Sequence, residues 1–146
     1  MRYGKAGATL EKLQNLCRKH DLKVTPQRIA IYMALVNSGK HPSAEQLHNE
    51  IKMQFPKISL DTVNRTLITY SRIGLISLVE GSGIARRYDA DMRNHHHAHC
   101  ISCGKITDFY DESLASLDVP EEIEKKFKIL NKKVVINGLC QKCQLE

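Results

Sequence analysis

Two Cys-x-x-Cys pairs in the second half of the sequence have the residue types and the spacing to bind a metal ion. Cys100 and Cys103 form the first pair, and Cys140 and Cys143 form the second. Four thiolates meet the tetrahedral preference of zinc at about 2.3 Å, and they leave no open position for a substrate. The spacing therefore predicts a closed structural zinc site, with two disulfides as the alternative.

The segment between the two pairs has room for a strand, a helix and a further strand. Residues 111–127 have a helical pattern, and residues 129–139 are rich in β-branched side chains, which favours a strand. The fifth cysteine, Cys17, falls among leucines at helical spacing near the start of the chain. We expect Cys17 to be a small buried residue without a metal role.

A run of histidines, His95-His96-His97-Ala98-His99, lies just before the first cysteine pair. Alternate side chains of a strand face one side, so His96 would point away from the other three. Those that would share a face are His95, His97 and His99. Imidazoles joined by carboxylates suit Fe(II), Mn(II) or Zn(II). The residues that could complete such a site are Asp89, Asp91, Asp108 and His41. A histidine cluster without a native metal is the alternative.

The charge is distributed unevenly along the chain. Within a net charge of +6, residues 1–88 carry 14 lysines and arginines against 6 aspartates and glutamates, whereas residues 89–146 carry 8 against 10. A basic first half is typical of a protein whose partner is a polyanion, such as a nucleic acid. The second half must have another role, so we expect a domain boundary after residue 88.

The composition excludes several other classes of protein. Hydrophobic residues make up 42% of the sequence, and no apolar run approaches the roughly 20 residues of a membrane span. The polar N-terminus lacks the apolar region of a signal peptide. We therefore expect a cytoplasmic protein without a membrane partner, in which the thiols stay reduced.

The basic half shows the signals of four helices followed by a hairpin. Leucines at helical spacing predict a first helix over residues 6–20. The residues that would cap the N-termini of the next three helices are Thr25, Ser43 and Ser59. Two short strand-like runs, residues 75–80 and 84–89, flank Gly81-Ser82-Gly83, which is typical of a hairpin turn.

Short helices followed by a hairpin on a basic segment are typical of a winged helix-turn-helix, whose last helix enters the major groove of DNA. The polar candidates for DNA contact on that helix, residues 59–70, are Asp61, Thr62, Asn64, Arg65 and Thr69. Arg65 is the strongest candidate for a base contact, because a guanidinium can bond O6 and N7 of guanine together. A contact of Arg65 with phosphate alone is the alternative. The expected fold class is α+β, with a winged-helix domain over residues 1–88 and a small α/β domain over residues 89–146.

Seven segments, in this order, resemble motifs of the ferric uptake regulator family. In the first domain they are LKVTPQR at residues 22–28, HPSAE at 41–45, and ISLDTVNRTL at 58–67, which is similar to the family's ISLATVYRTL. At and after the boundary they are RYD at residues 87–89, HHHAHC at 95–100, CGKITDF at 103–109 and GLCQKC at 138–143. Each motif is weak alone, but their combination in this order is highly specific.

The resemblance implies a homodimeric, metal-dependent transcriptional repressor, in which the first domain binds double-stranded operator DNA and the second dimerises. Matched position by position, the ligands of the structural Zn2+ would be Cys100, Cys103, Cys140 and Cys143. The ligands of the regulatory Fe2+ or Mn2+ would be His41, Asp89, His95, His97 and Asp108. The DNA contacts would come from Lys23, which reaches the minor groove, and from Thr62, Asn64 and Arg65 on the recognition helix.

Asp108 favours the peroxide-responsive branch of this family, because the iron-sensing branch usually has glutamate at that position. In the peroxide-responsive branch, Fe(II) reacts with hydrogen peroxide and oxidises a ligand histidine. His41 and His95 match the oxidised positions, and the loss of one ligand would release the two domains and hence the operator. Reversible iron sensing is an alternative, as is zinc sensing with the additional imidazoles of His96 and His99.

Two further classes of function compete with a regulator. Histidines with aspartates also activate water in metal-dependent hydrolases, but the basic helical half has no role in such an enzyme and the sequence has no nucleophile motif. A metal-storage protein would hold labile metal and bind no specific DNA sequence. We therefore favour a regulator that is not an enzyme. Asn64 replaces the family's usual tyrosine, which can pack on thymine methyl groups, so the operator sequence stays open.

Overall fold

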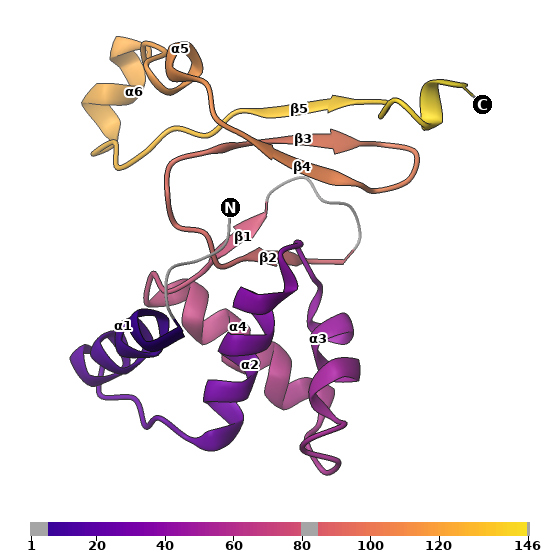
Figure 1. Cartoon of the computed structure of the whole chain (residues 1–146). Coiled ribbons are helices and arrows are strands. Elements are labelled where there is room, and N and C mark those ends of the chain that lie inside the picture. Colours follow the sequence, from indigo (N-terminus) through magenta and orange to yellow (C-terminus); the bar gives the residue numbers. More distant parts are fainter. Residues whose placement is uncertain (1–5, 80–84, 146) are drawn as a thin grey trace. The chain divides into compact units, whose positions relative to one another are not determined.

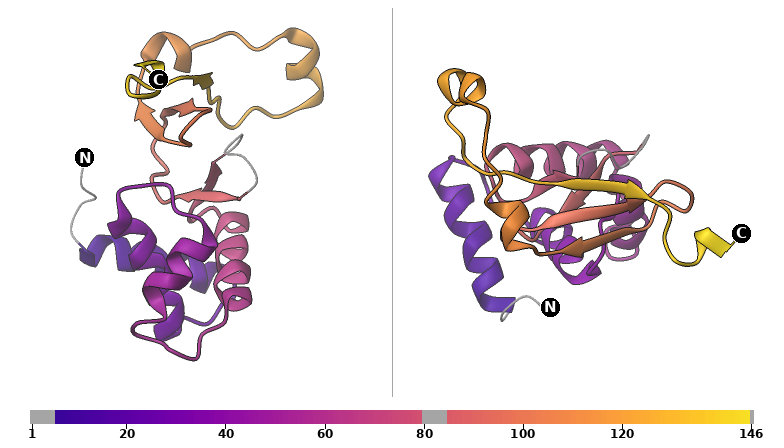
Figure 2. Two further views of the ribbon diagram at one scale, coloured as in Figure 1. Left: turned by 90° about the vertical axis from the view of Figure 1, so that its right-hand side faces the viewer. Right: turned by 90° about the horizontal axis from the view of Figure 1, so that it is seen from above.

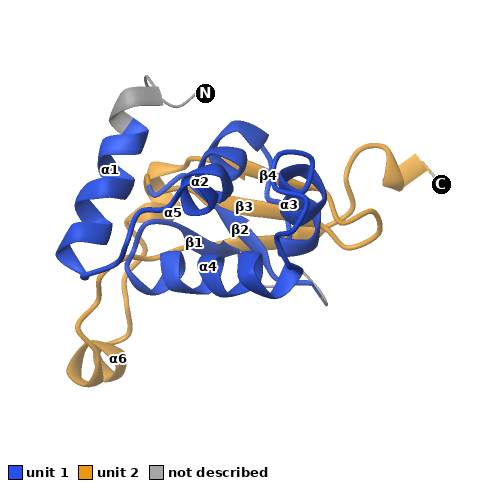
Figure 3. Ribbon diagram, turned by 90° about the horizontal axis from the view of Figure 1, so that it is seen from below, with its two compact units in different colours: residues 1–92 blue, residues 93–146 orange. Residues whose placement is uncertain are grey.

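The structure, a computed structural model, describes residues 6–79 and 85–145 (Figure 1). The chain divides into two compact units, residues 1–92 (unit 1) and 93–146 (unit 2), shown in Figure 3. The division thus follows residue 92, whereas the sequence suggested one after residue 88. The later division keeps Asp89 in unit 1, where it is paired with Ser77 in a two-stranded sheet.

Unit 1 begins with four helices, and the last three start directly after the predicted N-caps Thr25, Ser43 and Ser59. They are α1 (Ala6–Lys19), α2 (Pro26–Ser38), α3 (Ala44–Ile51) and α4 (Leu60–Arg72). The Thr25 side chain accepts a hydrogen bond from the backbone N–H of Arg28, and Gly39 ends α2 in the left-handed conformation at φ 59°. Ser43 and Gln46 form a reciprocal capping box. None of the helices within the described ranges is long and apolar enough to cross a membrane.

The helices of unit 1 enclose an apolar core. α1 runs across the direction of α4 (Figure 3), and all four helices contribute buried side chains. The buried aliphatic residues of the core include Leu13, Ile31, Leu35, Leu47, Val63 and Leu67. Cys17 lies in this core with 0% of its surface exposed, so its predicted role as a small buried residue is confirmed. Burial stabilises a fold by about 1.5–3 kcal/mol per large aliphatic side chain, so ordinary hydrophobic packing holds unit 1 together.

A short antiparallel hairpin follows the helices. β1 (Ser77–Val79) pairs with β2 (Arg87–Asp89), and Leu78 lies opposite Tyr88. The turn predicted at Gly81-Ser82-Gly83 lies outside the described residues. Four helices and an antiparallel pair, in this order, form a winged helix-turn-helix.

Unit 2 is built on a three-stranded sheet in the order β4-β3-β5 (Figure 2). Its strands are β3 (His96–Cys100), β4 (Ile106–Phe109) and β5 (Val135–Gly138). β4 runs antiparallel to β3, whereas β5 runs parallel to it and therefore needs a crossover connection. The helical elements of unit 2 are α5 (Glu112–Ala115) and α6 (Glu121–Lys126) in the crossover, and the 3-10 turn η1 (Cys143–Leu145) after β5.

The prediction of one helix over residues 111–127 was wrong. Residues 116–120 separate α5 from α6, and Pro120 stands directly before α6. Proline lacks the N–H that a continuous helix needs, and it disfavours helical backbone at the preceding residue, Val119. The strand expected within residues 129–139 is present but confined to β5.

Candidate metal centres

The four cysteines of unit 2 converge on one point and are called the cysteine cluster below. The ligand sulfurs of Cys100, Cys103, Cys140 and Cys143 all lie within 4.8 Å of one another. Cys103 Sγ and Cys140 Sγ are 3.8 Å apart, which matches the edge of a tetrahedron whose corners lie about 2.3 Å from a central ion. All five cysteines of the chain are free thiols, so the structure does not support two disulfides. The donor set and its spacing fit a zinc ion.

Strand register brings the two Cys-x-x-Cys segments together. Cys100 ends β3 and lies opposite Gly138 at the end of β5, so Cys140 follows close beside it. The backbone N–H of Cys140 donates to Cys100 Sγ at 3.3 Å. In the first segment, Gly104 turns the chain back with φ 76° and donates its N–H to the carbonyl oxygen of Cys100. This left-handed backbone favours glycine.

Hydrogen bonds within the cysteine cluster lower the pKa of two of its thiols and raise that of a third. The N–H of Cys103, with that of Cys140, lowers the pKa of Cys100 to about 6, so its thiolate prevails at neutral pH. The N–H of Cys143 lowers the pKa of Cys140 in the same way. A hydrogen bond with Ser102 lowers the pKa of Cys143, but Cys140 and burial outweigh it and raise that pKa to about 12. Four thiolates therefore cannot accumulate here without a cation to offset their repulsion.

In unit 1, His41 and Asp89 form a buried pair. His41 Nε2 lies 3.3 Å from Asp89 Oδ2, and each side chain is only 6% exposed. The other carboxylate oxygen of Asp89 accepts a hydrogen bond of 2.8 Å from the backbone N–H of Asp91. This contact fixes the carboxylate with Oδ2 toward the imidazole. Of the two upstream aspartates that the sequence offered, Asp89 is therefore the one beside His41.

Contacts between distant residues place His41 beside Asp89. Arg87 Nε donates to the carbonyl oxygen of His41, 46 positions away in the sequence. The N–H of Tyr88 donates to the carbonyl oxygen of Pro42 at 3.1 Å, and Ser43 forms an isolated bridge with Arg87. The role of Arg87 in holding this loop was missed by the sequence analysis, because no local pattern signals a contact over such a distance.

In unit 2, His95, His97 and Asp108 form what is called the histidine cluster below. His97 Nε2 lies 3.1 Å from His95 Nε2 and 3.2 Å from Asp108 Oδ1. His95 Nε2 lies 3.8 Å from the same oxygen. The register of β3 and β4 places His97 opposite Asp108, which explains why these side chains meet. Two imidazole nitrogens and a carboxylate oxygen that converge in this way fit Fe(II), Mn(II) or Zn(II).

The backbone determines which nitrogen of His95 faces the histidine cluster. His95 Nδ1 lies 2.6 Å from the carbonyl oxygen of Arg93. A carbonyl can only accept, so Nδ1 carries the ring proton and Nε2 keeps its lone pair for a metal. Arg93 acts here through its backbone, and its residue type therefore gave no signal in the sequence.

The remaining two histidines of the run, His96 and His99, are buried as well. His96 points to the other face, as predicted: its Nδ1 accepts a hydrogen bond of 3.0 Å from the N–H of Val134, and its ring packs on Phe109. None of the surface of His96 is exposed (0%), so this imidazole lies in the interior rather than on the surface. The ring centre of His99 lies 6.2 Å from that of His97.

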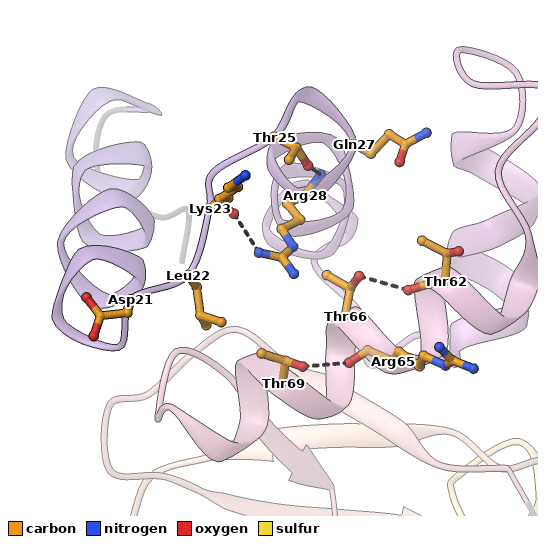
Figure 4. A pocket seen from close by; sticks show the side chains of 10 residues that line it. All are labelled: Asp21, Leu22, Lys23, Thr25, Gln27, Arg28, Thr62, Arg65, Thr66 and Thr69. Atoms are coloured by element: carbon orange, nitrogen blue, oxygen red, sulfur yellow. Dashed lines mark hydrogen bonds between the residues drawn. The ribbon is translucent and has the colours of Figure 1, made fainter.

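A hollow of about 570 Å³ lies in unit 1 between α4 and the segment that leads into α2 (Figure 4). Three cationic side chains line it, Lys23, Arg28 and Arg65, whereas Asp21 is the one carboxylate among its lining residues. The exposed positions of α4 include Thr62, Asn64 and Arg65, but Asn64 is not among the residues that line the hollow. Of the residues predicted to contact DNA, Lys23, Thr62 and Arg65 therefore lie around this cationic hollow of unit 1.

A sequence model of the ferric uptake regulator family matches residues 19–137. This chain belongs to the ferric uptake regulator family. Among its relatives, the peroxide-responsive repressor PerR of Staphylococcus epidermidis is 31% identical over 129 residues, which span 88% of this chain and 86% of the relative. PerR of Staphylococcus aureus (strain Mu50) is 31% identical over 127 residues, which span 87% of this chain and 86% of that relative.

Solved structures of this family share the fold. The ferric uptake regulator Fur of Helicobacter pylori, with three functional metal-binding sites, is 30% identical with a TM-score of 0.78, and the match covers 99% of this chain and 97% of that one. PerR of Streptococcus pyogenes, whose structure concerns peroxide sensing and gene regulation, is 29% identical with a TM-score of 0.53 over 92% of each chain. The predicted α+β fold, with an N-terminal winged helix-turn-helix and a C-terminal α/β domain, is confirmed.

Proposed function

We propose that this member of the ferric uptake regulator family is a homodimeric, metal-dependent repressor of transcription that responds to peroxide. The observation that supports this best is the distribution of its imidazole and carboxylate ligands. Unit 1 carries the buried pair of His41 and Asp89, and unit 2 carries the histidine cluster. Ligands on both units would let one ion couple a signal to the unit that binds DNA.

In this proposal the cysteine cluster holds a structural zinc ion. Its ligands are Cys100, Cys103, Cys140 and Cys143, whose sulfurs all lie within 4.8 Å of one another. Four thiolates fill the coordination sphere and leave no position for a reactant. This zinc therefore contributes to the folding of unit 2 and takes no part in sensing.

The regulatory ion in this proposal is Fe(II) or Mn(II), bound jointly by both units. Its ligands are His41, Asp89, His95, His97 and Asp108. An ion bound by both units restricts their relative orientation, and its loss removes that restriction. Because the coupling is reciprocal, DNA strengthens metal binding by the same factor by which metal strengthens DNA binding.

Peroxide would act on this site by destroying one of its ligands. Bound Fe(II) supplies the electron transfer, and the net reaction adds one oxygen atom of hydrogen peroxide to an imidazole carbon and releases the other as water. His41 and His95 are the two histidines that we expect to be oxidised. An oxidised ring no longer offers the same lone pair, so the two units lose their shared ion and the operator is released.

DNA binding belongs to unit 1 in this proposal. α4 would enter the major groove of double-stranded operator DNA with Thr62, Asn64 and Arg65, and Lys23 would reach the minor groove. Lys23 and Arg65 both line the cationic hollow beside α4. Such a surface suits the phosphate backbone of a nucleic acid, whose neutralisation supplies much of the binding energy.

We assign dimerisation to unit 2, because many of its large apolar side chains are exposed. They include Leu117, Phe127, Leu130, Ile136 and Leu139. A second copy of unit 2 would cover such side chains and remove them from water. The proposed dimer acts in the cytoplasm as a regulator rather than as an enzyme.

Peptide mass spectrometry tests the peroxide response. Protein loaded with Fe(II) without oxygen and then given a small dose of hydrogen peroxide should gain one oxygen atom at His41 or His95. The Mn(II)-loaded protein should stay unmodified. His48 should stay unmodified in both samples, because it belongs to neither group of residues that could hold a metal ion. An unmodified Fe(II) sample would overturn peroxide sensing in favour of reversible iron or zinc sensing.

A gel-shift assay with promoter DNA tests the class of function. Metal-loaded protein should prefer specific fragments over random DNA, and the preference should fall when the regulatory metal is removed. Binding without any sequence preference would favour a metal-storage protein. Turnover of a phosphoester or peptide by the metal-loaded protein would favour a hydrolase.

A further inference from the structure

We propose that Asp61 is a positioning residue for Arg65 and thereby sets the base preference of α4. This inference rests on the proposed function, because it assumes that the exposed face of α4 reads operator DNA. It concerns which bases the helix selects, which neither the fold nor the ligand clusters determine.

A direct contact joins the two side chains on the exposed face of α4. Arg65 Nε lies 2.9 Å from Asp61 Oδ2, and the side chains are 79% and 65% exposed. Asp61 stands in the first turn of α4, one helical turn before Arg65. Exposed ion pairs of this kind contribute little to stability, so the effect of the contact lies in where it holds the guanidinium.

The contact uses the Nε of Arg65 and leaves the terminal amino groups of the guanidinium for another partner. Those two groups are the ones that can bond O6 and N7 of guanine together. A long arginine side chain on a helix surface otherwise samples many rotamers, and ordering them on binding costs affinity. Asp61 restricts these rotamers before DNA arrives, which favours the base contact over a contact with phosphate alone.

The charge of Asp61 strengthens this selection. Its partner Arg65 lines a hollow together with Lys23 and Arg28. A carboxylate beside Arg65 repels phosphates and lowers the affinity for DNA of any sequence. The same carboxylate accepts a hydrogen bond from the amino group of cytosine when one is presented. Asp61 therefore lowers the affinity for DNA of any sequence and increases the discrimination between sequences.

The residue beside Arg65 in the sequence, Asn64, also favours contacts with base edges. Asn64, which precedes Arg65 in α4, is exposed as well. An asparagine side chain can bond adenine through N6 and N7. The exposed face of this helix is thus equipped with hydrogen-bonding groups, and we infer an operator half-site with a guanine at the position facing Arg65.

Selection from a randomised duplex library tests the inference. The full-length protein, loaded with zinc and Mn(II), should enrich a guanine at one fixed position of each half-site. Asp61→Asn and Asp61→Ala should each reduce the preference for that guanine about tenfold, while binding to unselected duplex becomes stronger. Asp61→Glu should restore most of the preference, because its longer carboxylate still reaches Arg65.

A matched control removes a carboxylate from a similar pair outside unit 1. Lys125 Nζ lies 2.7 Å from Glu121 Oε1 at the same helical spacing in α6, so Glu121→Gln should leave the base preference unchanged. Circular dichroism of each variant checks that α4 still forms. An unchanged guanine preference in Asp61→Asn, or its persistence in Arg65→Ala, would overturn the inference while leaving DNA binding in place. If the unaltered protein enriches no sequence, the proposed function itself fails.

Discussion

The two units of this chain bury different kinds of side chains. The buried cluster of unit 1 is almost wholly aliphatic and aromatic. Among the described residues of unit 2, by contrast, those that are buried are His95, His96, His97, His99 and Cys100. The interior of unit 1 thus consists mainly of apolar side chains, whereas the interior of unit 2 consists of imidazole and thiol groups, which can bind metals.

This difference indicates that the two units have different sources of stability. Hydrophobic burial stabilises unit 1 without any ligand. Buried imidazoles and thiolates are costly unless they are paired or bind a cation, and the large apolar residues of unit 2, such as Phe127 and Leu130, are exposed. Unit 2 therefore depends on binding free energy, because a ligand that binds only the folded state stabilises it by mass action.

Loss of zinc should have the largest effect, and this effect should be confined to unit 2. A chelator, or the variant Cys103→Ser, should unfold unit 2 and leave unit 1 folded, because structural zinc contributes on the order of 10 kcal/mol to small domains. Hydrogen exchange should show lost protection in β3, β4 and β5 and unchanged protection in α1–α4. Cys17→Ala is the matched control, since Cys17 lies in the core of unit 1, and its zinc content should be normal. Loss of protection throughout α1–α4 would contradict independent stability.

A cavity in the core of unit 1 should destabilise unit 1 and leave the zinc site of unit 2 unaffected. Leu67 in α4 is 0% exposed, so Leu67→Ala should destabilise unit 1 by about 2–5 kcal/mol and leave the zinc content unchanged. Urea denaturation followed by circular dichroism measures the change in the free energy of unfolding. Leu60→Ala, at a position that is 43% exposed, should cost much less. Equal losses for both variants would show that burial does not govern the stability of this unit.

Removal of one imidazole from the histidine cluster should separate the two kinds of metal site. His95→Ala should weaken Mn(II) binding by at least about tenfold, because even indirect partners of a ligand have effects of this size. Calorimetric titration measures this loss, and elemental analysis should show the same zinc content as before. DNA binding should no longer respond to Mn(II). If zinc is lost as well, the cysteine and histidine clusters are not separate sites.

The smallest expected effect concerns a single helix cap. The Thr25 side chain accepts a hydrogen bond from the N–H of Arg28 at the start of α2, so Thr25→Ala should destabilise unit 1 by about 1 kcal/mol. Thr25→Ser keeps the hydroxyl and should cost only a fraction of this. Thermal unfolding resolves the difference, whereas the affinities for both metals should stay the same. A cap variant that changed metal affinity would link the packing of α2 to the ligands.

Features encoded in neighbouring residues were predicted well from the sequence. Thr25, Ser43 and Ser59 mark the starts of α2, α3 and α4, because a cap acts within one turn of its helix. The cysteine spacing was equally informative, since zinc restricts ligand number and geometry more than the fold does. The predicted helix over residues 111–127 is interrupted for a local reason too, because Pro120 cannot continue a helix that begins before it.

Features that depend on distant contacts could not be predicted from residue patterns alone. The choice of Asp89 over Asp91 as the neighbour of His41 depends on Arg87, which holds the loop of His41 from 46 positions away. The burial of His96 depends on Val134, which lies 38 positions further along the chain. The grouping of His41 and Asp89 with the later histidines was predicted from the family resemblance, not from the periodicity of the sequence.

The parallel pairing of β5 with β3 also has a consequence for the order in which the chain folds. Cys100 lies opposite Gly138, so the sheet of unit 2 closes only after distant residues meet, which is a slow step. In unit 1, consecutive helices pack on one another, and such local contacts form sooner. We therefore expect a newly made chain to pass through an interval in which unit 1 is folded and four thiols still lack their metal. Exposed thiolates are susceptible to oxidation. We therefore expect the supply of zinc to determine the fraction of chains in which unit 2 folds before its cysteines are oxidised.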